Sequence, residues 1–477
     1  MDANTCPPLL EEILRRAHRR YRLPALADSP ARMPAADPSA KLAVAIEHAR
    51  ESLARNEPPG QALKQLFIDA LAQLIRDALR TGAGDPAFQA MVLRHRAPAV
   101  REYASLSAHA RQDERGIRGI VNAIAHPARL RPMPAGPRRD ALDRLHATAA
   151  AGSWSALSQA AEQLRAAMDR DEALETASTP AIAAGLTRLL GSPALERLRR
   201  LEALRADKLV QRYQTLWEKQ GPRAGSSQAA MAGSASRRRG SAVETSAMRA
   251  LQALAARLNK AEGAGTHGTA DNYRVVASMR VPASIPASHR HAKTEWDAVL
   301  LKLARSSGAG ADAAWDICLL AEAKASVEAA STDLPRLLRG LRLLARAEAD
   351  NSYSFRTQEG TIALCGASLS ALATDETSLK KIVLYCCDAP AAATLRPLSA
   401  ASRMQLLSAP ASLEFAAALE ARRHADPRLL GAVWRELLES PRWAAVLQQY
   451  PTQRLARDLM VNTADLLAAV ENRNPGD

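Results

Sequence analysis

Three charged residues in the middle of the chain stand in a pattern that could do chemistry. Glu322 and Lys324 lie two residues apart at the end of the apolar run WDICLLAEAKA, and Asp297 stands near the start of the run EWDAVLLKLA. A buried strand normally avoids charges, because an unpaired buried charge is costly. Two carboxylates held close together repel each other unless a cation or a proton lies between them. The pattern therefore predicts a cation beside these carboxylates.

The chemistry that fits these residue types is metal-assisted hydrolysis of a phosphodiester. Carboxylates, together with a carbonyl and waters, are the ligand set of a hard divalent ion such as Mg²⁺. Such an ion lowers the pKa of a bound water and polarises the phosphodiester. We expect Asp297 and Glu322 to bind Mg²⁺ or Mn²⁺. Lys324 would orient or deprotonate the attacking water, or stabilise charge on the phosphate, so all three residues are candidates for catalysis.

The two carboxylates meet only if the two runs pair in one register. The Gly-rich segment SSGAGADAA between the runs predicts a hairpin. If Ala304 lies opposite Trp315, then Asp297 lies opposite Glu322 on one face of the hairpin, because directly opposed residues share a face. A slip by one residue would separate them. The alternative to a metal site is that these residues lie at the solvated end of the hairpin and form ordinary cross-strand ion pairs.

The neighbouring segments predict the elements that would hold this hairpin. AVETSAMRALQALAARLNKA reads as a helix and YRVVASMRV as a strand, and both precede the hairpin. LPRLLRGLRLLARAEA follows it as a helix, with Thr332 or Asp333 as the N-cap. TIALCGAS and KKIVLYCCD read as two further short strands. The predicted order of the central region is α-β-β-β-α-β.

Asp297, followed by Glu322-Ala323-Lys324 on the next strand, resembles the PD-(D/E)xK nuclease superfamily, which has a restriction-endonuclease-like fold. That family has an α-β-β-β-α-β core, with the Asp on its second strand and the ExK on its third. The resemblance covers Ala242 to Asp388. It implies a metal-dependent nuclease. Trp296 stands where the family often has a proline before the Asp.

The same resemblance implies a third metal ligand. The family often carries a metal-site Glu on its first helix, and Glu244 is in that position. A Glu in the first turn of a helix is also favoured by the helix dipole, whatever its function. Two further functions stay open for the chain. One is a helical interaction or scaffold protein with a catalytically inactive nuclease-like domain, and the other is a basic nucleic-acid-binding protein without catalysis.

The charge of the chain predicts a polyanionic partner. The formal net charge is +14, which favours nucleic acid, with DNA expected before RNA. Arg336, Arg339 and Arg342 recur at three-residue spacing after the ExK and would contact a phosphate backbone. The alternative is the ordinary polar face of an amphipathic helix.

The predicted elements indicate an α+β core flanked by all-α regions in a protein that is mostly helical overall, and the resemblance implies that this core is nuclease-like. The predicted parts are a helical N-terminal domain (1–220), a basic Gly/Ser-rich linker (221–241), the nuclease-like domain (242–396) and a helical C-terminal region (397–477). The helical regions could contact a protein partner or a second copy of the chain.

Several other classes of protein are not indicated by the sequence. It contains no GxxxxGK[ST] motif, no GxSxG motif and no Cys/His spacing typical of zinc sites. No apolar run approaches the length of a membrane-spanning helix, and the N-terminus lacks the apolar core of a signal peptide. We therefore expect a cytoplasmic protein without a membrane partner.

Overall fold

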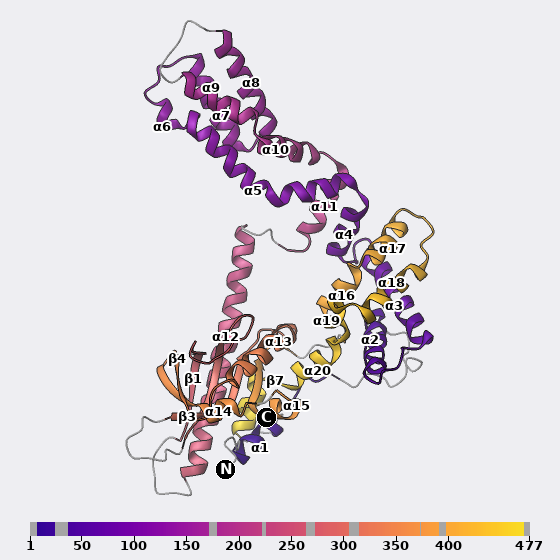
Figure 1. The fold of residues 1–477 in the computed structure, drawn as a ribbon, viewed down its shortest axis with the longest axis vertical. Helices are drawn as coiled ribbons and strands as arrows, with labels where there is room; N and C mark the ends of the chain where they lie inside the picture. Colours follow the sequence, from indigo (N-terminus) through magenta and orange to yellow (C-terminus); the bar gives the residue numbers. More distant parts are fainter. Residues whose placement is uncertain are drawn as a thin grey trace. The chain divides into compact units, whose positions relative to one another are not determined.

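The protein is mostly helical and contains one mixed β-sheet (Figure 1). The computed structural model describes residues 7–23, 37–170, 179–221, 226–263, 272–304, 314–372, 374–390 and 397–471. The mixed α+β class agrees with the prediction. None of the helices in these ranges combines the length and the apolar character needed to cross a membrane.

The chain divides into two compact units, and their boundaries differ from those of the predicted domains. The first unit consists of Met1–Leu71, Ala224–Leu406 and Gly431–Asp477, and the second consists of Ala72–Arg223 and Leu407–Leu430. The predicted N-terminal domain (1–220) is therefore shared between the units, as is the predicted C-terminal region (397–477). Segments at both ends of the chain join the sheet-containing unit because α1 (Pro8–Arg16) and α21 (Thr463–Glu471) bury apolar side chains in its core.

The second unit is helical. Its elements are α4 (Pro86–Arg96), α5 (Pro98–Ala125), α6 (Pro127–Leu130), α7 (Pro137–Ala151), α8 (Trp154–Arg170), α9 (Thr179–Leu190), α10 (Pro193–Leu204), α11 (Lys208–Glu218), α17 (Pro410–Glu420) and η2 (Pro427–Leu430). Leucine and isoleucine side chains of α5, α7, α8, α9 and α10 form its largest core. Prolines in the first turn begin many of these helices, where the missing N–H is no loss.

The sheet lies in the first unit and has seven strands. They are β1 (Tyr273–Arg280), β2 (Glu295–Leu303), β3 (Ala314–Ala323), β4 (Ser352–Thr357), β5 (Gly360–Cys365), β6 (Val383–Cys387) and β7 (Met460–Asn462). β1, β2 and β3 pair as an antiparallel meander. β6 pairs parallel to β3, and β7 pairs parallel to β6. β4 and β5 form a separate hairpin that contacts β1 and the start of β3.

Two of these strands differ from the prediction. β4 was not expected, and β7 lies within a C-terminal stretch predicted to be helical throughout. All three residues of β7 are buried. A three-residue strand carries too little alternation to be distinguished from the helices beside it, and its pairing with β6 defines it.

Helices cover both faces of the sheet. The other elements of the first unit are α2 (Pro38–Ala54), α12 (Ser227–Gly263), α13 (Val327–Leu344), α14 (Gly366–Ser370), α15 (Glu376–Ile382), α16 (Ala400–Leu407), α18 (Gly431–Glu439), η3 (Pro441–Trp443), α19 (Ala444–Leu447) and α20 (Gln449–Asp458), and α3 (Gln61–Leu79) begins here and ends in the second unit. α13 packs on one face through a core that includes Leu334, Leu337 and Leu341. α12, α1 and α21 pack on the other.

The register of the central hairpin agrees with the prediction at one end and differs at the other. Ala298 lies opposite Ala321, as predicted, but Leu303 rather than Ala304 lies opposite Trp315. A bulge at Cys318 causes the difference, because it adds one residue to β3. The bulge places Ile317 on the face that packs against α13 and Cys318 on the face that packs against α12. The predicted turn lies mainly in 305–313, outside the described residues.

Most of the predicted linker is helical. Residues 227–241 form the first part of the 37-residue helix α12, which also contains the helix predicted after the linker. The Ser226 hydroxyl accepts a hydrogen bond from the Ala229 N–H at 3.1 Å and caps the helix. Alanine, methionine and arginine in this stretch have high helix propensity, which outweighs the glycines and serines that suggested a linker.

α13 begins earlier than predicted. Its N-cap is Ser326, whose hydroxyl accepts from the Ala329 N–H at 3.2 Å, and not Thr332 or Asp333. The helix continues through Pro335. A proline normally interrupts a helix because it lacks a donor, which is why the sequence suggested a start at this point. The earlier start lets α13 bury Val327 and Ala330 against the sheet.

Candidate active site

The carboxylates of Asp297 and Glu322 lie together across β2 and β3. The register of the two strands ends with Ala298 opposite Ala321, and Asp297 and Glu322 are the next residues along each strand. The Asp297 N–H donates to Oε1 of Glu322 at 3.4 Å, and the Ala323 N–H donates to Oδ2 of Asp297 at 2.9 Å. The predicted meeting of these two side chains is therefore observed. We call Asp297 and Glu322 the carboxylate pair.

Glu322 is fully buried and contacts two lysines. Oε2 of Glu322 lies 2.6 Å from Nζ of Lys293 and 3.0 Å from Nζ of Lys324. Burial, together with the nearby Asp297, raises the pKa of Glu322 to about 7, although both lysines favour the charged form. A buried carboxylate of this kind is tolerated only with cations beside it.

Lys324 is held by a second carboxylate as well. Its Nζ lies 3.3 Å from Oδ2 of Asp333, which also accepts a hydrogen bond from the Tyr385 hydroxyl at 3.3 Å. Burial lowers the pKa of Lys324, but Glu322 and Asp333 outweigh burial and leave the pKa above its ordinary value. Lys324 is therefore an ammonium group in this arrangement, suited to stabilising negative charge rather than to removing a proton.

Lys293 is a site residue that the sequence analysis missed. It is buried, it precedes β2, and its N–H donates to the Arg336 carbonyl of α13 at 3.2 Å. α13 approaches closely here, because a Cβ added at Gly340 would lie 2.8 Å from Cβ of Lys293. A single lysine in the run HAKTEWD carries no signal of burial, so only the packing of α13 reveals its role.

Glu244 lies on α12 within electrostatic range of the carboxylate pair. It is exposed, and its pKa is raised by partial burial and by Asp297, with Lys324 opposing. α12 begins at Ser227, so Glu244 stands in the helix interior and not in a first turn. The helix-dipole explanation for this residue is therefore wrong.

The carboxylate pair is suited to bind a divalent cation whose remaining coordination positions are filled by other ligands. Mg²⁺ is commonly bound by one or two carboxylates plus waters and substrate phosphates. Both lysines contact Oε2 of Glu322, whereas Oε1 has, among the described residues, only the long contact with the Asp297 N–H. Within the described ranges, no three His, Cys, Asp or Glu side chains are grouped closely enough to hold a metal ion. Glu244 is therefore not part of a preformed cluster.

The three predicted nucleic-acid-binding arginines lie on the exposed surface of α13. Arg336, Arg339 and Arg342 are all exposed. Nε of Arg339 donates to the His291 carbonyl at 2.8 Å. α13 also supplies Asp333 and the contact with Lys293, so the same helix joins the arginines to the candidate site.

Comparison with known proteins identified no relative. No protein-family model, no curated protein and no solved structure is significantly similar to this chain. The functional argument therefore depends on the geometry of the site and on the motif.

Proposed function

We propose that the protein is a metal-dependent nuclease whose core is related to the PD-(D/E)xK superfamily. The observation that carries the proposal is the carboxylate pair on adjacent strands, with the Lys324 ammonium 3.0 Å from Glu322. The order α12-β1-β2-β3-α13-β6, with β6 parallel to β3, is the order that the resemblance implies, with the β4–β5 hairpin inserted. The side-chain arrangement and the order of the elements both support a nuclease-like core.

Each residue of the site has a distinct role in this proposal. Asp297 and Glu322 would hold Mg²⁺ or Mn²⁺, and Glu244 would contribute from α12, directly or through water. A bound divalent ion would lower the pKa of a water and polarise the phosphodiester. Lys324 would stabilise the charge that develops on the phosphate, and Asp333 would keep it protonated and oriented. Lys293 would position Glu322 by holding Oε2.

Nucleic acid is the proposed substrate, with DNA favoured over RNA. The net charge of +14 and the exposed arginines of α13 support a polyanion. Phosphate contacts from such arginines provide affinity without base recognition.

One observation favours a second candidate, a nucleic-acid-binding protein with an inactive nuclease-like domain. Lys293 and Lys324 together already neutralise Glu322. A buried carboxylate with two lysine partners can be a purely structural ion pair. In that case the protein would bind nucleic acid without cutting it.

The test is incubation of the purified protein with plasmid, single-stranded DNA and RNA, with Mg²⁺ or Mn²⁺ and then with chelator. We expect metal-dependent cleavage that chelator stops. Asp297→Asn keeps the shape but removes a charged ligand, so cleavage should fall by at least about 100-fold. Asp350→Asn, an exposed aspartate outside the site, is the matched control and should cut normally.

Thermal stability gives a second readout of the same site. Mg²⁺ or Mn²⁺ should raise the Tm of the wild type, because a ligand that binds only the folded state stabilises it. Asp297→Asn should remove most of this increase in Tm. Lys324→Ala should abolish cleavage but keep the increase in Tm, because Lys324 is not a metal ligand. The nuclease proposal would be refuted if neither metal changed the Tm of the wild type and the wild type cut no substrate. The second candidate, a nucleic-acid-binding protein without cleavage, would then remain.

A further inference from the structure

A pocket of about 650 Å³ lies beside α1 in the first unit, away from the carboxylate pair. This volume is within the range of ligand-binding pockets, about 300–1,000 Å³. Its lining is strongly basic, with cations from two segments of the chain: Arg15, Arg19, Arg22, Lys380 and Lys381. Two acidic residues, Glu11 and Glu12, also line it. None of the lining residues belongs to the candidate active site.

Most acidic side chains near the pocket are already paired. Glu11 pairs with Lys381 at 3.0 Å, and Glu12 pairs with Arg16, which does not line the pocket. Asp458 is shared between Lys380 at 3.2 Å and Arg22 at 3.6 Å. Lys380 also pairs with Glu376 at 2.8 Å. The five cations that line the pocket still outnumber the two acidic residues that line it.

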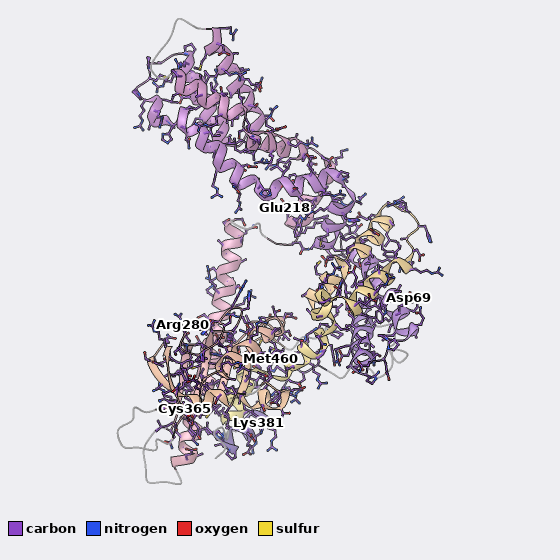
Figure 2. The ribbon with its side chains drawn as sticks, viewed as in Figure 1. Asp69, Glu218, Arg280, Cys365, Lys381 and Met460 are labelled. Atoms are coloured by element: carbon purple, nitrogen blue, oxygen red, sulfur yellow. The ribbon has the colours of Figure 1, made fainter. Side chains whose placement is uncertain are left out.

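Arg19 contributes a half-buried guanidinium that is paired with no carboxylate among the described residues. It donates only to main-chain carbonyls, those of Leu14 and Met460, each at 3.2 Å. Figure 2 labels Met460 and Lys381, which mark this part of the molecule. Burial and the neighbouring Arg22 lower the pKa of Arg19, and Asp458 opposes them only in part. A half-buried cation that forms no ion pair is costly, and an anionic ligand would reduce that cost.

The segment that carries these arginines is anchored to the sheet, so the pocket is built before any ligand binds. The Tyr21 hydroxyl donates to the Ala389 carbonyl at 2.5 Å and accepts from Nδ2 of Asn462 at 3.1 Å. Arg20 forms a two-pronged ion pair with Asp465. Arg20 and Tyr21, which lie between Arg19 and Arg22, are therefore held in place.

We propose that this pocket binds a ligand with several adjacent phosphate groups. Guanidinium groups match phosphate oxygens in geometry and charge, and the lining offers both arginines and lysines. Adjacent phosphates occur in a nucleoside polyphosphate and along a nucleic acid backbone. The site is independent of the proposed cleavage, since it shares no residue with the carboxylate pair.

The test is titration calorimetry on the full chain in chelator, so that no metal-dependent event contributes. One arm uses inorganic tripolyphosphate and the other a single-stranded DNA 20-mer. Arg15→Gln is the main variant, because Arg15 is exposed and supports no described contact of the fold. Arg435→Gln, exposed on α18, is the control. We expect Arg15→Gln to weaken binding about tenfold in at least one arm, with Arg435→Gln unchanged.

The two arms identify the source of the phosphates. Loss confined to tripolyphosphate indicates a free polyphosphate ligand, and loss with the 20-mer indicates the nucleic acid backbone. Arg19→Gln should reinforce the effect of Arg15→Gln in the same arm. The proposal would be overturned if the wild type and Arg15→Gln had equal affinities in both arms. It would also be overturned if the wild type showed no saturable binding.

Discussion

At the scale of single residues, Glu322 has the most unusual environment in the candidate site. It is fully buried, yet it contacts two lysine ammonium groups through one oxygen. This arrangement neutralises the carboxylate in the absence of metal, and it leaves the other oxygen oriented toward Asp297. The pair of lysines therefore makes a buried acidic site compatible with a stable fold.

Removing Lys293 should cost more stability than removing a comparable lysine at the surface. Lys293→Met leaves Glu322 with Lys324 alone, and we expect the free energy of unfolding to fall by about 3 kcal/mol, because breaking a buried ion pair leaves an uncompensated charge. Lys302→Met breaks the Lys302–Glu262 pair, in which both side chains are about one third exposed, and should cost at most about 1 kcal/mol. Urea unfolding measures both.

A double-mutant cycle separates the ion pair from other effects of the Lys293 substitution. Lys293→Met combined with Glu322→Gln should cost less than the sum of the two single changes, by at least about 1 kcal/mol. Strictly additive losses would mean that Lys293 acts through packing and not through Glu322.

At the scale of elements, α13 connects the parts of the site. It begins directly after β3, supplies Asp333 to Lys324, and approaches Lys293 so closely at Gly340 that no side chain fits there. The bulge at Cys318 acts on the opposite end of the hairpin. It leaves the pairing of Ala298 with Ala321, next to Asp297 and Glu322, as predicted.

Two glycine substitutions should have opposite effects on stability. In Gly340→Ala the new methyl would lie 2.8 Å from both Cβ and the carbonyl oxygen of Lys293, and we expect a loss of about 1–3 kcal/mol. Gly240→Ala, in α12, has open space around the new methyl and should gain up to about 1 kcal/mol from helix propensity. Urea unfolding of the two variants checks this, and equal effects would contradict the close approach of α13.

At the scale of the whole molecule, the excess of positive charge is the dominant feature. Arg336, Arg339 and Arg342 form one exposed basic group on α13, and Arg237, Arg238 and Arg239 form another on the first part of α12. The two groups carry the same charge, so comparing them distinguishes a local phosphate contact from a general electrostatic attraction.

Replacing the α13 arginines by glutamine should weaken nucleic acid binding and reduce its dependence on salt. Each phosphate contact that is lost should lower the slope of log affinity against log salt by roughly 0.7–0.9. The same replacement at 237–239 should have a smaller effect. Fluorescence anisotropy at several salt concentrations measures this, and equal slopes for the two triple variants would assign the effect to net charge alone.

The sequence by itself determined the strands of the hairpin and the meeting of Asp297 with Glu322. Period-two alternation of apolar residues is a local property, and matching the apolar faces of two adjacent runs permits few registers. It also predicted a helix on each side of the meander, although it placed the starts of α12 and α13 too late. Prolines, glycines and serines made both starts look like breaks. Helix propensity outweighed these local signals in α12, and packing against the sheet outweighed them in α13.

Only the tertiary structure decided which distant residues complete the site and the pocket. Lys293 reaches Glu322 because α13 holds it there, and Arg19 reaches the Met460 carbonyl across 441 residues of chain. β7 is a strand because its backbone pairs with the edge of β6. These features depend on contacts between segments far apart in the sequence, whose energies appear only when both partners are in place, and so no local pattern of residue types encodes them.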